Sequence, residues 1–171
     1  YPAMAGRGLA EIAAEWSVDE STAIERLKPG GAIYHQIDEA DMERILSYPP
    51  SLVGSDGLPG DENPHPRLWG AFPRILGHYA RDKGLFPLET AIAKMTGHTA
   101  KVLGLEMHGT IAPGQMADLV LFDSDRILDA STYESPRAPA EGIVSVFLGG
   151  RRTWADGSAM VSGRGGVLGR G

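Results

Sequence analysis

The sequence contains no cysteine and no excess of positive charge. Without cysteine, the 171-residue chain has neither a disulfide framework nor a thiolate ligand for a metal. Lys and Arg number 16 against 22 Asp and Glu, and the resulting net charge of −6 argues against a nucleic-acid-binding surface. No apolar run approaches the ~18 to 20 residues needed to cross a bilayer, and the first residues lack the pattern of a secretory signal. These absences favour a cytoplasmic protein without a membrane or nucleic-acid partner.

One turn in the first half of the chain carries the clearest candidate for chemistry. Leu52 and Val53 favour an extended backbone, while Gly54 and Gly57 allow it to turn sharply, so Asp56 projects from the end of a predicted strand. In (β/α)8 barrels and open α/β sheets, catalytic groups lie at the carboxyl ends of the strands. Ser-Asp-Gly is also ordinary turn chemistry, and local sequence by itself favours that interpretation.

The spacing of apolar residues and the turn signals predict the order of elements along the chain. Helices are expected over 9–16, 21–27, 38–46, 73–83 and 87–97, with one further turn at 100–103. Short strands at 32–37 and 52–54 flank one of these helices, which predicts a βαβ unit with a parallel sheet. Beyond residue 104 we expect a strand at 117–123 and a hairpin over 143–154, turning at Gly149 and Gly150.

Seven segments distributed over nearly the whole chain match one known pattern. They are GRGLAEIAA at 6–14, VGSDG at 53–57, NPHPR at 63–67, AFPRIL at 71–76, KMTG at 94–97, the glycine-bounded turn 109–114 and ADLVLFD at 117–123. Together they resemble the carboxyl-terminal part of the N-acyl-D-amino-acid deacylases (D-aminoacylases) of the amidohydrolase superfamily. The Gly-to-Asp strand is common in that superfamily, whereas Ser-Asp-Gly-Leu-Pro followed by His-Pro-Arg nine to eleven residues after Asp56 is much narrower.

The resemblance implies an α/β fold in two parts. Residues 1–104 would form the C-terminal part of a (β/α)8, TIM-like metal-dependent hydrolase barrel. Residues 105–171 would add a small β-sandwich unit, the C-terminal segment of a composite β-domain, ending in a Gly/Arg-rich stretch at 163–171. A complete barrel needs ~250 residues, so most of it is expected upstream of Tyr1.

The resemblance also implies a reaction, the zinc-dependent hydrolysis of linear amide C–N bonds. N-acyl-D-amino acids would yield a D-amino acid and a carboxylate, and Asp56 matches the family's aspartate that borders the metal and moves protons. The main zinc ligands, histidines and a cysteine, are expected upstream of Tyr1. Because zinc needs at least three protein ligands, the chain by itself should be inactive and should require the missing N-terminal part of the same enzyme.

Two residues of the strand predicted before Asp56 match positions that contact substrate in the family. These are Tyr34 and Ile37, and the resemblance assigns them to the pocket for the substrate's side chain or carboxylate. An aromatic residue on a strand is more often part of the core, so packing remains the alternative for Tyr34.

The loop after Asp56 supplies two further substrate-binding candidates, His65 and Arg67. Arg67 offers a planar fork of donors that suits the carboxylate present in every N-acyl amino acid. Alternatively, Arg67 pairs with the acidic residues at 61–62 and only pins the loop. His65 is predicted to hydrogen-bond Asp56 and so to orient it.

Two other functions stay open at this stage. One is a cyclic-amide hydrolase of the same superfamily, of the dihydroorotase or hydantoinase type. The other is a non-catalytic module that serves only binding or assembly.

Overall fold

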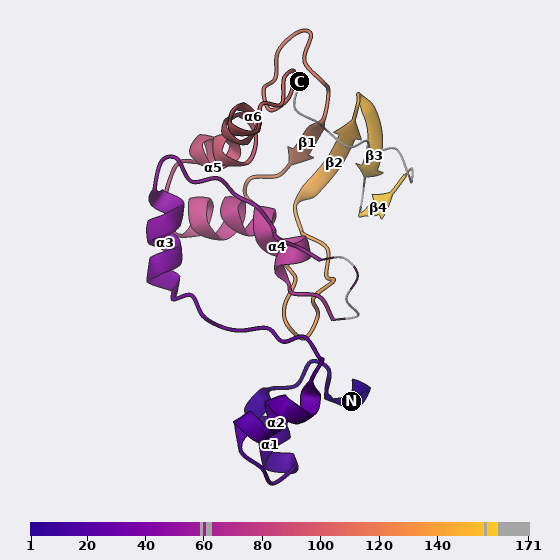
Figure 1. Cartoon of the computed structure of the whole chain (residues 1–171). Coiled ribbons are helices and arrows are strands. Elements are labelled where there is room, and N and C mark those ends of the chain that lie inside the picture. The colour runs from indigo at the N-terminus through magenta and orange to yellow at the C-terminus, as the bar shows by residue number, and fades with distance from the viewer. Residues whose placement is uncertain (59, 61–62, 156, 161–171) are drawn as a thin grey trace.

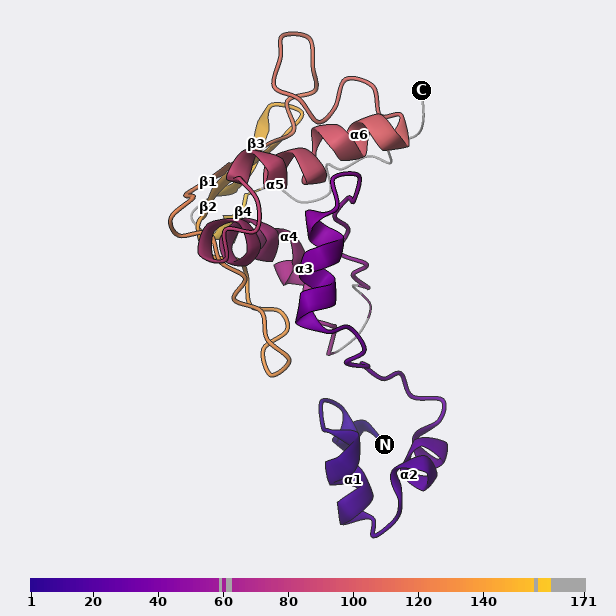
Figure 2. The same cartoon turned by 90° about the vertical axis from the view of Figure 1, so that its left-hand side faces the viewer.

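The computed structural model describes residues 1–58, 60, 63–155 and 157–160, and it begins with a small helical unit. After a short turn of 3-10 helix (Pro2–Met4), helices α1 (Leu9–Glu15) and α2 (Glu20–Leu27) pack against each other. Asp19 caps α2, since its Oδ1 accepts a hydrogen bond of 2.7 Å from the Thr22 N–H. Figures 1 and 2 show this pair lying apart from the rest of the molecule. Both predicted N-terminal helices are confirmed.

The strand predicted at 32–37 is not formed. This segment is an irregular connection from α2 to the main body, and the side chains of Tyr34 and Ile37 are 69% and 64% exposed. A strand exists only while its backbone pairs with a neighbouring strand, and none of the described backbone hydrogen bonds joins 32–37 to another segment. The predicted βαβ unit is therefore wrong for the described residues.

Helix α3 (Glu39–Ser47) follows as predicted, with Asp38 as its cap: Asp38 Oδ1 accepts from the Ala40 N–H at 2.8 Å. The second predicted strand, 52–54, is also absent. Its Val53 packs against the core, but the segment has no paired neighbour among the described strands.

The next helix begins six residues earlier than predicted. Helix α4 (Arg67–Arg74) starts directly after Pro66, and Pro73 lies inside it rather than at its beginning. Proline removes a hydrogen-bond donor from the helix interior. From Ile75 the chain continues as a wider π-helical segment, η2 (Ile75–Asp82), in whose last turn the Lys83 N–H reaches back five residues to the His78 carbonyl.

Two further helices complete the helical part. Helix α5 (Leu88–Met95) follows Pro87, as predicted, but Gly97 begins α6 (Gly97–Leu103) instead of ending α5. Gly104 ends α6 in the left-handed conformation, with φ +67°. None of the described helices has both the length and the apolar character needed to cross a membrane.

The C-terminal part forms one antiparallel sheet in the order β1-β2-β3-β4. Its strands are β1 (Leu119–Phe122), β2 (Ile143–Leu148), β3 (Arg151–Ala155) and β4 (Ser158–Ala159). The predicted strand and hairpin are confirmed, and Gly149 and Gly150 turn with φ of +55° and +75°. The described strands make a single sheet, so they do not contain the second layer of the predicted sandwich. The predicted Gly/Arg-rich end lies outside the described residues.

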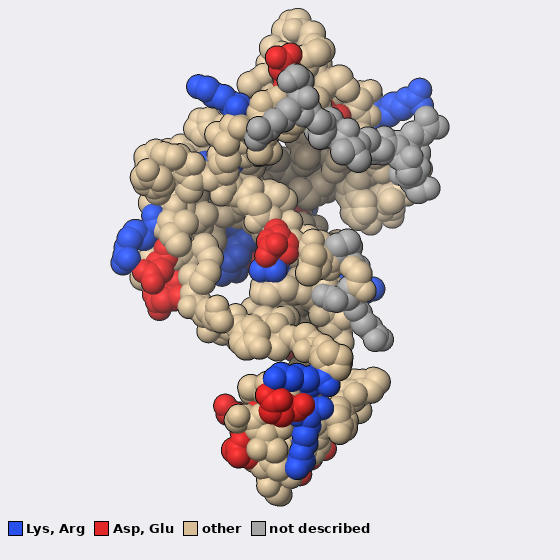
Figure 3. All heavy atoms as spheres, viewed as in Figure 1, with Lys and Arg blue, Asp and Glu red and all other residues tan. Residues whose placement is uncertain are grey.

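The core joins the helical part to the β part. Leu46 of α3, Leu76 and Tyr79 of η2 and Ala91 of α5 belong to one buried cluster. Ile127, which follows β1, is fully buried in the same cluster. The β part is therefore not an independent appendage, and its position constrains the helices. On the face shown in Figure 3, acidic and basic side chains lie interspersed over this body.

Candidate functional site

The turn Ser55-Asp56-Gly57 places the Asp56 carboxylate on the surface of the described chain. Asp56 has φ +46°, a left-handed conformation that aspartate tolerates better than most residues. Gly57 packs so closely on Leu68 that a Cβ at this position would collide with it, and its N–H donates to Ser55 Oγ at 3.3 Å. These contacts hold the turn, while the Asp56 side chain itself is 82% exposed.

Arg67 is the direct partner of Asp56. Its Nη2 lies 2.7 Å from Asp56 Oδ2, and Arg67 is the first residue of α4. The alternative partners at 61–62 lie outside the described residues. The structure thus brings together the two charged residues that the sequence analysis placed on one loop.

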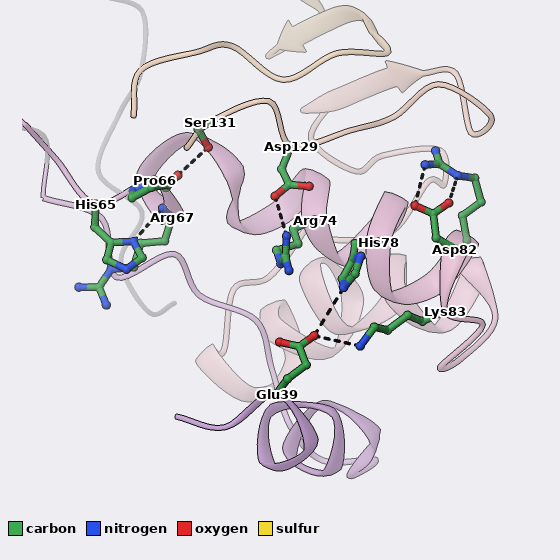
Figure 4. Close-up of polar contacts among 11 residues, drawn as sticks. Glu39, His65, Pro66, Arg67, Arg74, His78, Asp82, Lys83, Asp129 and Ser131 are labelled. Carbon is green, nitrogen blue, oxygen red and sulfur yellow. Dashed lines mark hydrogen bonds and ion pairs between the residues drawn. The ribbon is translucent and has the colours of Figure 1, made fainter. Parts of the chain in front are cut away.

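His65 supports Arg67 and makes none of the described hydrogen bonds to Asp56. Its Nδ1 accepts a hydrogen bond of 3.0 Å from the Arg67 N–H, and its Nε2 lies 3.3 Å from Tyr133 Oη (Figure 4 shows the first contact). Burial, followed by the nearby charges of Arg67 and His35, lowers the pKa of His65 below its ordinary value. The predicted bond from His65 to Asp56 is therefore replaced by a bond to the backbone of Arg67.

Tyr34 and Ile37 stand apart from this contact. No described hydrogen bond or ion pair joins either residue to Asp56, and both side chains are exposed. Their segment is nevertheless linked to the loop through Tyr133. The ring of Tyr133 lies 5.0 Å from that of His35 and also contacts His65 on the loop.

The described residues do not form a metal site by themselves. They contain no group of three or more His, Cys, Asp or Glu side chains that could hold a metal. Asp56 provides one carboxylate, whereas zinc in a catalytic site takes three protein ligands. Asp56 as a metal ligand stays a prediction that requires ligands from outside the described residues.

The sequence analysis did not identify the residues of the β part that fix α4 in place. Ser131 Oγ donates to the Pro66 carbonyl at 2.9 Å, and Arg74 Nη1 lies 3.1 Å from Asp129 Oδ2 (Figure 4). On α4, a Cβ at Gly70 would collide with Ser131. Glycine inside a helix often marks a close approach, so Gly70 was a sequence signal for this contact.

Comparisons with known proteins agree with the predicted resemblance. A model described as the amidohydrolase family matches residues 6–157. D-aminoacylase from Alcaligenes xylosoxydans xylosoxydans is 52% identical over 156 residues, which make up 91% of this chain and 32% of that protein.

Two solved structures share the fold. One is D-aminoacylase, described with a binuclear metal centre, which matches with a TM-score of 0.95 at 52% identity over 99% of this chain and 36% of that chain. The other is N-acyl-D-glutamate deacylase from Bordetella bronchiseptica, complexed with zinc and a phosphonate inhibitor, with a TM-score of 0.85 at 45% identity over 90% of this chain and 32% of that chain.

These matches decide the family and the fold. The chain spans about a third of the length of the relatives it matches. The predicted barrel-type metal-dependent hydrolase fold is confirmed through the match to D-aminoacylase, although the two strands predicted in the first half are not formed. We conclude that this chain belongs to the amidohydrolase family.

Proposed function

We propose that the full-length protein containing this chain is a zinc-dependent hydrolase that removes the acyl group from N-acyl-D-amino acids. The observation that carries the proposal is the match to D-aminoacylase at 52% identity and a TM-score of 0.95, because it covers 99% of the chain and so includes the Asp56 turn. The products would be a free D-amino acid and a carboxylate.

In this proposal Asp56 is the group that moves protons. Hydrolysis of an amide requires a proton to leave the attacking water and a proton to reach the departing nitrogen, and one carboxylate can do both in turn. A zinc ion held there would polarise the amide carbonyl and acidify water. Ligands beyond Asp56 would come from outside the described residues, in agreement with the prediction that the chain alone is inactive.

We assign the substrate's carboxylate to Arg67. A guanidinium carries five N–H donors, and the ion pair with Asp56 involves Nη2, so the same fork can also bind a second carboxylate. His65 would support the backbone of Arg67, and Tyr34 and Ile37 would face the substrate from their connecting segment. This places the negative end of the substrate next to the carboxylate that acts on its amide.

The substrate class is tested with the full-length protein loaded with zinc. N-acetyl derivatives of D-amino acids are expected to be hydrolysed, with release of a primary amine, and the matching L-enantiomers are expected to react at least about a hundredfold more slowly. Opening of the ring of hydantoins or dihydroorotate to an N-carbamoyl amino acid, without hydrolysis of N-acetyl-D-amino acids, would instead support the cyclic-amide alternative. A full-length protein that hydrolyses neither class would contradict the proposal and favour a non-catalytic module.

Arg67→Lys tests the carboxylate site. Lysine keeps the positive charge beside Asp56 but lacks the planar fork, so KM is expected to rise about tenfold while kcat changes much less. Arg44→Lys is the matched control, because Arg44 also forms an exposed ion pair, 2.8 Å from Asp41 on α3. A KM that stays the same in both variants would mean that Arg67 only pins the loop.

A further inference from the structure

The segment between β1 and β2 reaches back to the beginning of α4. Its stem is closed by the Asp123 N–H, which donates to the Gly142 carbonyl at 2.8 Å, and by two backbone hydrogen bonds between Leu128 and Glu141, of 3.2 and 3.0 Å. The residues beyond this stem, 129–140, extend away from the sheet and pass along α4. A part of the β unit therefore lies against the loop that carries the candidate active-site residues.

The start of this tip is fixed to α4 by side chains. Asp129 pairs with Arg74, and Ser131 donates to the carbonyl of Pro66, the residue immediately before Arg67 (Figure 4). Ser131 is buried, and Gly70 leaves just enough space for it. Because Asp129 and Ser131 are both bound to α4 or to the residue before it, the residues that follow Ser131 have a defined position beside the loop.

Tyr133 uses this position to contact two histidines from different segments. Its ring lies 5.0 Å from the ring of His35 and 5.4 Å from that of His65, both edge to face, with interplanar angles of 65° and 77°. Edge-to-face pairs of this kind are favourable because the positive edge of one ring meets the negative face of the other. His35 follows Tyr34 directly, and His65 lies two residues before Arg67.

The hydrogen bonds of His65 determine which tautomer its neutral ring adopts. Since Nδ1 accepts from the Arg67 N–H, the neutral ring must carry its proton on Nε2. That N–H then donates to Tyr133 Oη, at 3.3 Å. Protonation of Nδ1 would place two donors face to face and break the bond to Arg67. Tyr133 thus accepts from the one tautomer that can hold the Arg67 backbone.

We propose that Tyr133 is a positioning residue that ties the segment of Tyr34 and Ile37 to the turn of Arg67. The ring of Tyr133 contacts His35, which adjoins Tyr34, and His65, which binds the Arg67 backbone. The two substrate-binding segments therefore keep a fixed separation, and Arg67 keeps its orientation. This inference rests on the proposed function for its consequence in catalysis. The physical coupling of the two segments does not depend on which substrate is bound.

The test compares Tyr133→Ala and Tyr133→Phe in the zinc-loaded full-length protein. Tyr133→Ala removes the ring and the hydroxyl, and we expect KM for an N-acetyl-D-amino acid to rise about tenfold or more with a much smaller change in kcat. Tyr133→Phe keeps the ring contacts and loses the hydrogen bond, for which about a two- to fivefold rise in KM is expected. Glu134→Ala, an exposed neighbour on the same tip, is the control and should leave both constants unchanged.

Hydrogen exchange gives a second readout that does not require activity. In Tyr133→Ala, amides of residues 33–37 and 65–68 should exchange faster than in the wild type, whereas Glu134→Ala should not alter them. Unchanged KM and unchanged exchange in Tyr133→Ala, in a wild-type protein that hydrolyses N-acetyl-D-amino acids, would overturn the inference. If the wild type lacks this activity, the proposed function fails, and the exchange comparison alone decides whether Tyr133 couples the two segments.

Discussion

Asp56→Asn in the zinc-loaded full-length protein is expected to lower kcat for N-acetyl-D-amino acids by about 10²- to 10⁴-fold, the usual contribution of a general acid or base. Asparagine has nearly the same shape as aspartate and tolerates the φ of +46° that Asp56 adopts, so the turn should be preserved. An amide cannot accept the proton of the attacking water, and the loss should therefore fall on turnover. Initial rates over a range of substrate concentrations measure this effect.

The control for this variant is Asp41→Asn. Asp41, like Asp56, is a largely exposed carboxylate paired with an arginine, but it lies on α3 away from the turn. Exposed ion pairs contribute little to stability, so both variants should unfold at nearly the wild-type temperature. A metal determination on Asp56→Asn separates loss of the proton carrier from loss of zinc. If kcat of Asp56→Asn matches that of Asp41→Asn, Asp56 has only a structural role in its turn.

Lys94→Met is expected to cause the largest loss of stability. Lys94 of α5 is 2% exposed, and its Nζ donates to three carbonyls of the turn after α3, those of Tyr48, Pro49 and Ser51, at 2.7, 3.3 and 3.2 Å. Ser51 Oγ lies 3.1 Å from the same nitrogen, so the four acceptors share the three hydrogens of the ammonium group. Methionine has a similar volume but leaves these acceptors unpaired, at a cost of about 3 kcal/mol. The unfolding midpoint of the full-length protein should then fall by about 3 °C.

The control is Lys101→Met on α6, where the lysine side chain is exposed and little change is expected. The pH dependence provides a separate check. Burial lowers the pKa of Lys94 below its ordinary value of 10.5. As the pH approaches 10.5, Lys94 therefore loses its proton in the folded chain before it does so in the unfolded chain, and the unfolded chain binds more protons than the folded one. The wild type should therefore gain stability relative to Lys94→Met in this alkaline range. Equal midpoints for the two variants at neutral pH would contradict the role of Lys94.

Local signals in the sequence were sufficient for the helices that begin at a capping residue. Asp19 and Asp38 lie directly before α2 and α3, and in both cases the carboxylate accepts a backbone hydrogen bond, which is the usual role of aspartate at this position. The hairpin at Gly149 and Gly150 was predicted for the same kind of reason, since its conformation depends on residues adjacent in sequence. Where the determining interaction spans a few residues, the sequence is informative.

The predictions of strands at 32–37 and 52–54 were wrong for the opposite reason. Their composition favours an extended backbone, but a strand also needs a partner, and the composition of one segment carries no information about a partner elsewhere. The prediction for the start of α4 was wrong because Pro66 and Pro73 are both typical of a helix beginning, and packing against the 129–140 tip favours the earlier one.

For the candidate site, the sequence by itself determined which chemical groups are available. A single aspartate on a glycine-flanked turn and an arginine eleven residues later follow from the order of residues, as does the membership in the amidohydrolase family. Only the tertiary structure decided which residues meet. The ion pair of Asp56 with Arg67, the bond of His65 to the Arg67 backbone and the contact of Tyr133 across 68 residues depend on how α4 docks on the β unit. Such contacts arise from packing between distant segments, which no local pattern encodes.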